Sequence, residues 1–152
     1  MKITTLILLP AFCLLLSCNT KTAADDSAIH LNGSWKLVAG NTITKGVSST
    51  TEYPKDQQMI KIINDTHFAF LNHRVNTTKD STNHFDAGGG SYTLKGNQYT
   101  EHLDYYSDKN WEGKAFTFTI TLKGDTLIQK GLEKVENENI DRIIIEKYIR
   151  MK

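Results

Sequence analysis

The stretch "LNGSWKLV" (residues 31–38) decides the fold, because it places a large aromatic residue at the head of an alternating apolar run. Trp35 is one of only two tryptophans in a chain of 152 residues. Apolar residues that recur at every second position predict a β-strand with one buried face. We therefore expect a strand over residues 33–40, in which Trp35 either closes the end of a β-structure or fills its core.

The rest of the chain repeats one pattern three times. Residues 61–70, 92–103 and 120–129 each contain two alternating runs joined by Asn-Asp, Gly-Asn or Gly-Asp. These residue pairs tolerate the positive φ angles of tight hairpin turns. Three hairpins, together with strands at 33–40 and 141–150, give eight strands, and no convincing amphipathic helix lies between them.

Eight consecutive antiparallel strands predict an all-β domain over residues 31–152. Closure into an up-and-down barrel removes the exposed strand edges and leaves room for one small ligand. A two-sheet sandwich is the alternative, but sandwiches use longer crossing connections than these tight turns. We therefore expect an eight-stranded antiparallel barrel.

Gly33-Ser34-Trp35 resembles the Gly-x-Trp signature that opens the first strand of lipocalins. The segments "GGGSYTLKGNQYTEHLDYYSD" and "GKAFTFTITLKGDTLI" are similar to small lipocalin-like (calycin-type) domains of bacterial lipoproteins, so the resemblance covers residues 31–150. The chain departs from many secreted lipocalins, because its sequence predicts no disulfide and no recognisable helix before the last strand.

The resemblance also implies two structural roles. Trp35 would plug the closed end of the barrel, and a basic residue late in the chain would pack over it. Arg150 is the candidate for that barrel-closure role, ahead of Arg142 and Lys147.

Turn positions predict which side chains face inward. A two-residue turn at Gly96-Asn97 pairs Leu94 with Tyr99 and Tyr92 with Glu101, and paired residues share a face. The inward face would then carry Gly88, Gly90, Tyr92, Leu94, Tyr99, Glu101, Leu103 and Tyr105, with Asp104 and Tyr106 among the outward residues. A turn at Gly124-Asp125 directs inward Phe116, Phe118, Ile120, Leu122, Leu127 and Gln129.

This interior is apolar and aromatic, with Tyr92, Glu101 and Gln129 as polar exceptions. A buried carboxylate is costly unless it is paired or protonated. Glu101 either forms an internal hydrogen bond, for instance with Tyr92, or holds the polar group of a ligand. The sequence thus predicts a binding site for a small, mostly apolar ligand, lined by Tyr92, Glu101, Leu103, Tyr105, Phe116, Phe118 and Gln129.

A protein-interaction module with a filled barrel is the alternative function. It would use the loops at 74–87 and 106–113, with Trp111 and Tyr105-Tyr106 as aromatic anchors.

Neither a metal site nor a catalytic group stands out. His67 and His73 are six residues apart on one strand, so roughly 20 Å separates them at ~3.3 Å per residue. His102 and Asp104 would supply half a site at most. No serine lies in a nucleophile elbow, and residues 31–152 contain no cysteine that could act as a nucleophile. We expect no metal, no cofactor and no enzymatic activity.

The first residues, "MKITTLILLPAFCLLLSC", form an apolar run that is too short for a spanning helix and reads as a secretory signal. Leu15-Leu16-Ser17-Cys18 resembles the lipobox of bacterial lipoproteins, which implies cleavage after residue 17 and lipidation of Cys18. The alternative is a plain signal peptide with an incidental Cys18. Residues 18–30 are polar and aperiodic, and we expect a flexible tether there.

Cleavage after residue 17 would leave 17 basic and 17 acidic residues, because Lys2 is the only charge removed. A neutral chain argues against a nucleic-acid partner. By resemblance to lipoproteins of Gram-negative cells, Asn19 favours the outer membrane. We expect a lipid-anchored monomer of the cell envelope.

Overall fold

The computed structural model describes residues 29–53, 57–75 and 84–152. Residues 1–28 lie outside the described part of the chain, so the expected signal peptide, the lipidation at Cys18 and most of the tether do too. Ile29, within the range expected for the tether, packs against the core. Among the described residues, no helix is long and apolar enough to cross a membrane.

The described chain forms ten β-strands and one short helical turn. Their order is β1 (Gly33–Thr44), β2 (Val47–Glu52), β3 (Gln57–Ile63), β4 (His67–Arg74), β5 (Phe85–Lys95), β6 (Gln98–His102), β7 (Tyr105–Tyr106), β8 (Ala115–Lys123), β9 (Thr126–Val135), the 3₁₀ turn η1 (Glu136–Glu138) and β10 (Ile140–Arg150).

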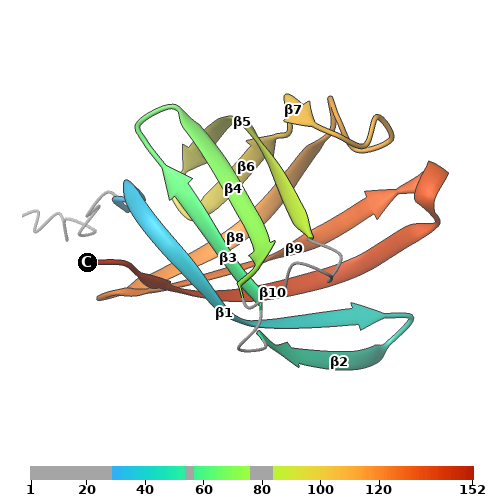
Figure 1. Ribbon diagram of the computed structural model, residues 1–152, viewed down its shortest axis with the longest axis horizontal. Helices are drawn as coiled ribbons and strands as arrows, with labels where there is room; N and C mark the ends of the chain where they lie inside the picture. The colour runs from blue at the N-terminus through green and yellow to red at the C-terminus, as the bar shows by residue number, and fades with distance from the viewer. Residues whose placement is uncertain (1–28, 54–56, 76–83) are drawn as a thin grey trace, which may run out of the picture.

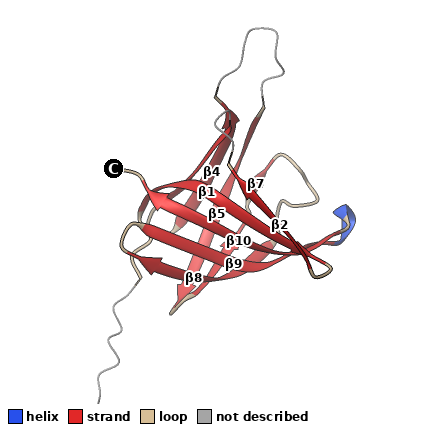
Figure 2. Ribbon diagram, turned by 90° about the horizontal axis from the view of Figure 1, so that it is seen from below, coloured by secondary structure: helices blue, strands red, loops and turns tan. Residues whose placement is uncertain are grey.

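The sheet closes on itself into a barrel (Figure 1). Neighbouring strands pair antiparallel in the order β10-β9-β8-β6-β5-β4-β3-β1, and β10 pairs in turn with β1. The predicted eight-stranded antiparallel barrel is therefore confirmed. The barrel strands are the six expected from the repeated hairpins and the two expected at 33–40 and 141–150, and a single short helical turn, η1, precedes the last strand (Figure 2).

Strand β1 is longer than its sequence pattern suggests. Residues 33–36 pair with β3, whereas residues 39–44 pair with β2 through a turn at Lys45-Gly46. The opposite edge of β1 pairs with β10 along nearly its whole length. The hairpin of β1 and β2 thus extends beyond the barrel wall, at the end away from the C-terminus (Figure 1). The sequence analysis did not predict β2, because all six of its residues are exposed and carry no apolar alternation.

The register predicted at the Gly96-Asn97 turn is correct as far as Tyr92 and Glu101. Beyond that point the prediction is wrong by one residue, since Gly89 pairs with Tyr105 and not with Asp104. The cause is a tight turn in which the Asp104 backbone N–H donates to the carbonyl of His102 at 3.0 Å. This turn adds one residue to the strand, so Tyr105 points to solvent with 71% exposure and Tyr106 points inward.

Gly90 makes this turn compatible with the barrel wall. A Cβ atom on Gly90 would lie 1.9 Å from the His102 carbonyl oxygen. The Asp104 carboxylate accepts hydrogen bonds from the Ser91 backbone N–H and hydroxyl at 2.9 and 3.1 Å. The backbone N–H of Ser91 is thus satisfied where the turn interrupts the pairing of β5 with its neighbour. These bonds, the backbone one above all, hold the pKa of the exposed Asp104 below its ordinary value.

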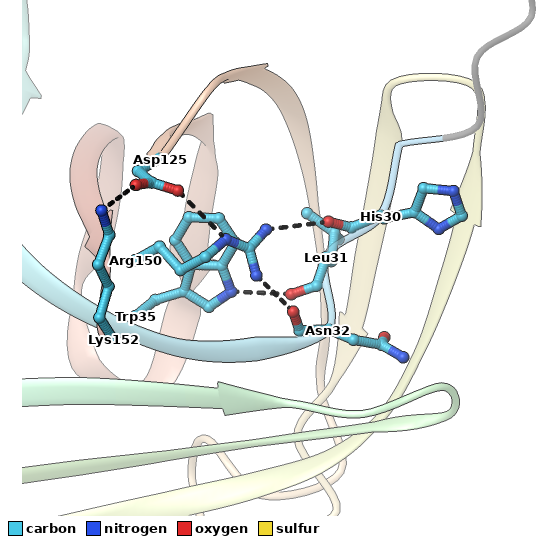
Figure 3. Close-up of polar contacts among 7 residues, drawn as sticks. All are labelled: His30, Leu31, Asn32, Trp35, Asp125, Arg150 and Lys152. Carbon is cyan, nitrogen blue, oxygen red and sulfur yellow. Dashed lines mark hydrogen bonds and ion pairs between the residues drawn. The ribbon is translucent and has the colours of Figure 1, made fainter.

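One end of the barrel is closed by Trp35, whose side chain is fully buried (Figure 3). The Arg150 guanidinium lies over the indole ring, and the indole N–H donates to the Leu31 carbonyl at 2.8 Å. Arg150 also donates to the carbonyls of Asn32 and His30 at 2.5 and 3.3 Å. One side chain therefore ties the last strand to the segment that enters the first strand.

Candidate ligand-binding cavity

A cavity of about 250 Å³ lies inside the barrel, beyond the layer that closes the end around Trp35. Its lining comes from β3 to β10 and from the segment that contains Trp111. Six side chains of acidic or basic residues line it: Lys61, Asp86, Glu101, Glu133, Arg142 and Glu146. The interior is thus much more polar than the sequence predicted.

Lys61 is the central charge of the cavity. It is only 2% exposed, and its Nζ donates to Glu101 Oε1 at 2.6 Å and to Gln129 Oε1 at 3.1 Å. The same Nζ lies 5.2 Å from the centre of the Tyr148 ring and 5.7 Å from that of Phe68. A buried ammonium is tolerable only with such partners. Glu101 is therefore neutralised by Lys61.

Tyr99 packs against this ion pair. Its ring centre lies 6.0 Å from Lys61 Nζ, and its hydroxyl is buried without a hydrogen-bond partner among the described residues. Burial, with the neighbouring charge of Glu101, raises the pKa of Tyr99 above its ordinary value. The phenol is therefore neutral.

A second ion pair joins β9 to β10. Arg142 donates to Glu133 Oε2 through Nε and also lies against it through Nη2, each at 2.7 Å. Both cations of the cavity are thus already paired with a carboxylate.

Glu146 is different, because a tyrosine and not a cation contacts its carboxylate. The Tyr148 hydroxyl donates to Glu146 Oε2 at 2.7 Å. Burial raises the pKa of Glu146 above its ordinary value, while the charge of Lys61 and the hydrogen bond from Tyr148 oppose that shift. Burial and the charge of Glu146 also raise the pKa of Tyr148, which remains the donor.

Asp86 is held in a similar way at the opposite wall. The Tyr106 hydroxyl donates to Asp86 Oδ2 at 3.1 Å. Burial first, and the charge of Asp86 second, raise the pKa of Tyr106 to about 12. Glu146 and Asp86 are therefore two carboxylates that face the cavity with a phenol as their hydrogen-bond donor.

Aromatic rings form the other part of the lining. Phe70 lies 5.8 Å from Tyr106 between ring centres, Tyr106 lies 6.5 Å from Trp111, and Trp111 lies 5.6 Å from Phe116. Such tilted and edge-to-face contacts fix the rings relative to one another. Gly88 leaves the room they need, because a Cβ there would lie 2.8 Å from the Phe70 ring.

The structure brings five of the seven predicted ligand-binding residues to this cavity. They are Glu101, Leu103, Phe116, Phe118 and Gln129. Tyr105 does not belong there, because the one-residue shift after His102 turns it to solvent, and its expected inward orientation is wrong.

Tyr92 does not line the cavity either. Its hydroxyl donates to the Asn64 carbonyl at 2.8 Å, so the expected hydrogen bond to Glu101 is not formed. Its ring packs against Tyr99 with the centres 5.1 Å apart. Tyr92 therefore belongs to the packing near the turn between β3 and β4.

The sequence analysis missed Lys61 and Glu146, although alternation could have placed both. Lys61 pairs with Phe70, which shares its face, and the register of that hairpin was not worked out. Glu146, Tyr148 and Arg150 are two residues apart on one strand, so alternation places them on the same face. Trp111, an anchor only in the alternative function, lines the cavity.

The arrangement suits binding. Among the described residues, no group of three or more His, Cys, Asp or Glu side chains could hold a metal ion. What the cavity offers is an aromatic wall, two ion pairs and two carboxylates with phenol partners.

Comparison with known proteins supports the fold. No protein-family model and no curated protein matches the chain. Among solved structures, the chain is similar to a lipocalin-like protein from Bacteroides uniformis, with a TM-score of 0.51 and 18% sequence identity. The match covers 80% of this chain and 98% of that one. The chain thus has a lipocalin-like barrel fold.

Proposed function

We propose that the barrel binds a small amphipathic molecule in its interior cavity. The observation that carries this proposal is the cavity of about 250 Å³, which has an aromatic wall and a set of buried polar groups. Ligand sites in proteins combine these two features, and a lipocalin-like barrel favours ligand binding in general. The volume lies below the ~300–1,000 Å³ of sites for drug-sized molecules, so the ligand is compact.

The ligand would lie with its apolar part against Trp111 and Phe116 and its polar part toward the charged groups. Buried polar groups impose specificity, because a ligand that leaves them unpaired loses affinity. The proposed ligand is therefore more polar than the mostly apolar molecule expected from the sequence.

The interaction module is the less favoured alternative. An interaction module of this kind requires a filled barrel, whereas this barrel contains a cavity. Trp111, one of its expected anchors, packs against Phe116 in the cavity lining. Tyr105 alone of the three expected anchors is strongly exposed. Residues 76–83 of one expected interaction loop lie outside the described part of the chain.

Calorimetric titration with benzylammonium, benzyl alcohol and benzoate tests the proposed function. These probes share one ring and differ in charge. The blocking variant is Met59→Trp, which places a large ring in the cavity, and its control is Ile62→Trp, on the exposed side of the same strand. We expect at least one probe to bind wild type and Ile62→Trp alike and to bind Met59→Trp much more weakly. Absence of binding by all three, or equal binding to both variants, would overturn the proposal.

We also propose that Cys18 anchors the protein to a membrane of the cell envelope through lipid. The support is the Leu-Leu-Ser-Cys sequence that ends an apolar leader. Two or three acyl chains give stable anchoring. Cys18→Ala should move the protein from the membrane fraction to the soluble fraction or block its processing. Unchanged partitioning, with no palmitate incorporated into the wild type, would contradict the anchor.

A further inference from the structure

The charges of the cavity do not balance. Four carboxylates and two cations line it, which leaves a formal charge of −2 when all are ionised. A partly enclosed space of low dielectric constant strengthens the effect of any such imbalance on a ligand. The excess of negative charge therefore favours cationic ligands over anionic ones.

Both cations of the cavity already have a carboxylate partner. Lys61 is bound to Glu101 and Gln129, and Arg142 is bound to Glu133. An anionic ligand that approached either cation would meet the negative charge of that cation's carboxylate partner, which opposes its binding.

The carboxylate of Glu146 is available. It faces the cavity from β10, and among the described residues its hydrogen-bond donor is the Tyr148 hydroxyl, which binds Oε2. Its other oxygen can accept a hydrogen bond from a ligand. Charge-assisted hydrogen bonds of this kind are about twice as strong as neutral ones.

The aromatic wall favours the same charge. Ring faces attract cations, and a tryptophan attracts them most strongly. Lys61 already shows this combination within the barrel, because its ammonium lies against a carboxylate and within 5.2–6.0 Å of three ring centres. Trp111, Tyr106 and Glu146 offer a comparable set of groups to a ligand.

We propose that the cavity selects a compact organic cation, a primary or secondary ammonium on an aromatic or apolar body, with Glu146 accepting its N–H and Trp111 flanking its ring. This inference rests on the proposed function, since it names the ligand class of the same cavity. It assigns Glu146 as a determinant of charge selectivity, on the wall opposite Asp86.

The charge series of benzylammonium, benzyl alcohol and benzoate tests the selectivity. In wild type we expect benzylammonium to bind about tenfold more tightly than benzyl alcohol, the effect of one charge-assisted hydrogen bond, and benzoate to bind most weakly. Tighter binding of the alcohol or of benzoate would overturn the cation assignment while leaving the proposed function intact. Failure of all three to bind would overturn both.

Glu146→Gln tests the assigned residue. This variant keeps an oxygen that can accept the Tyr148 hydrogen bond, and it removes the charge. It should therefore weaken the binding of benzylammonium about tenfold and leave the affinity for benzyl alcohol unchanged. Glu136→Gln is the matched control, because it removes one acidic charge from an exposed side chain in η1. Unchanged benzylammonium affinity in Glu146→Gln, or an equal loss in Glu136→Gln, would contradict the role of Glu146. If Glu146→Gln does not fold, the charge series in wild type still decides the ligand class.

Discussion

The guanidinium carbon of Arg150 lies 4.0 Å from the centre of the Trp35 ring, and this contact closes one end of the barrel. The two residues are also paired across β1 and β10, so the first and last barrel strands meet at this point. Asp125 Oδ1, in the turn between β8 and β9, lies 3.8 Å from Arg150 Nε and links this hairpin to the closed end.

Replacement of Trp35 by alanine should lower the free energy of unfolding by about 3–5 kcal/mol, the range for a buried large aromatic. The indole is fully buried and its N–H is bonded, so the substitution removes both packing and a hydrogen bond. Urea unfolding measures the change. A loss below roughly 1 kcal/mol would show that Trp35 does not close the barrel.

Gly33→Ala should destabilise the barrel more than Gly46→Ala. Both glycines have positive φ, at 136° and 80°, but a Cβ on Gly33 would also lie 2.7 Å from Arg150 Nη1, whereas nothing lies within 4 Å of one on Gly46. The difference between the two variants measures the contact with Arg150. That difference should shrink when Arg150 is also replaced by alanine. An equal loss in both glycine variants, with or without Arg150, would mean that the guanidinium does not occupy this space.

Lys61→Met should cost about 3–5 kcal/mol, because it leaves Glu101 buried without its cation. Glu101→Gln should also destabilise, by leaving Lys61 without its anion. The double variant Lys61→Met/Glu101→Gln should cost less than the sum of the two single changes, and chemical unfolding of all four proteins gives the coupling energy. Additive losses would show that the 2.6 Å contact does not couple the two side chains.

Glu146→Gln should stabilise the barrel at neutral pH. Burial raises the pKa of Glu146 in the folded state, so its preference for the protonated form favours folding at low pH and is lost as the pH rises through the folded pKa. The ionised group therefore costs stability at about pH 7, and glutamine removes that cost. The gain should disappear below the ordinary glutamate pKa of about 4.3, where both states are protonated.

Thermal midpoints at about pH 7 and about pH 4 measure this difference. Glu136→Gln, on the exposed η1, should show no comparable gain at either pH. A lower midpoint for Glu146→Gln at neutral pH would mean that the ionised carboxylate stabilises the fold and that its pKa is not raised.

The barrel could be predicted from the sequence because its evidence is local. Alternation and turn chemistry fix strands and registers over a few residues, and the pairing of Tyr92 with Glu101 is correct for that reason. The exchange of Tyr105 and Tyr106 could not be predicted in the same way. It depends on the backbone turn between His102 and Asp104, which no turn dipeptide marks in the sequence.

The charged interior was missed for a different reason. Lys61 follows Met59 and Ile60 and precedes two isoleucines, and a lysine within such a run is usually an exposed side chain. Its two hydrogen-bond acceptors and the nearest aromatic ring come from β6, β9 and β10, far along the chain. Only closure of the barrel brings Glu101, Gln129 and Tyr148 to the same ammonium.

A crystal structure of the chain from residue 19 onward, grown with benzylammonium at saturating concentration, tests the central claim most directly. The account predicts the probe inside the barrel, with its ring beside Trp111 and its nitrogen within hydrogen-bond distance, about 2.7–3.2 Å, of Glu146. A probe bound only on the outer surface, or a cavity filled by its own side chains, would contradict the account.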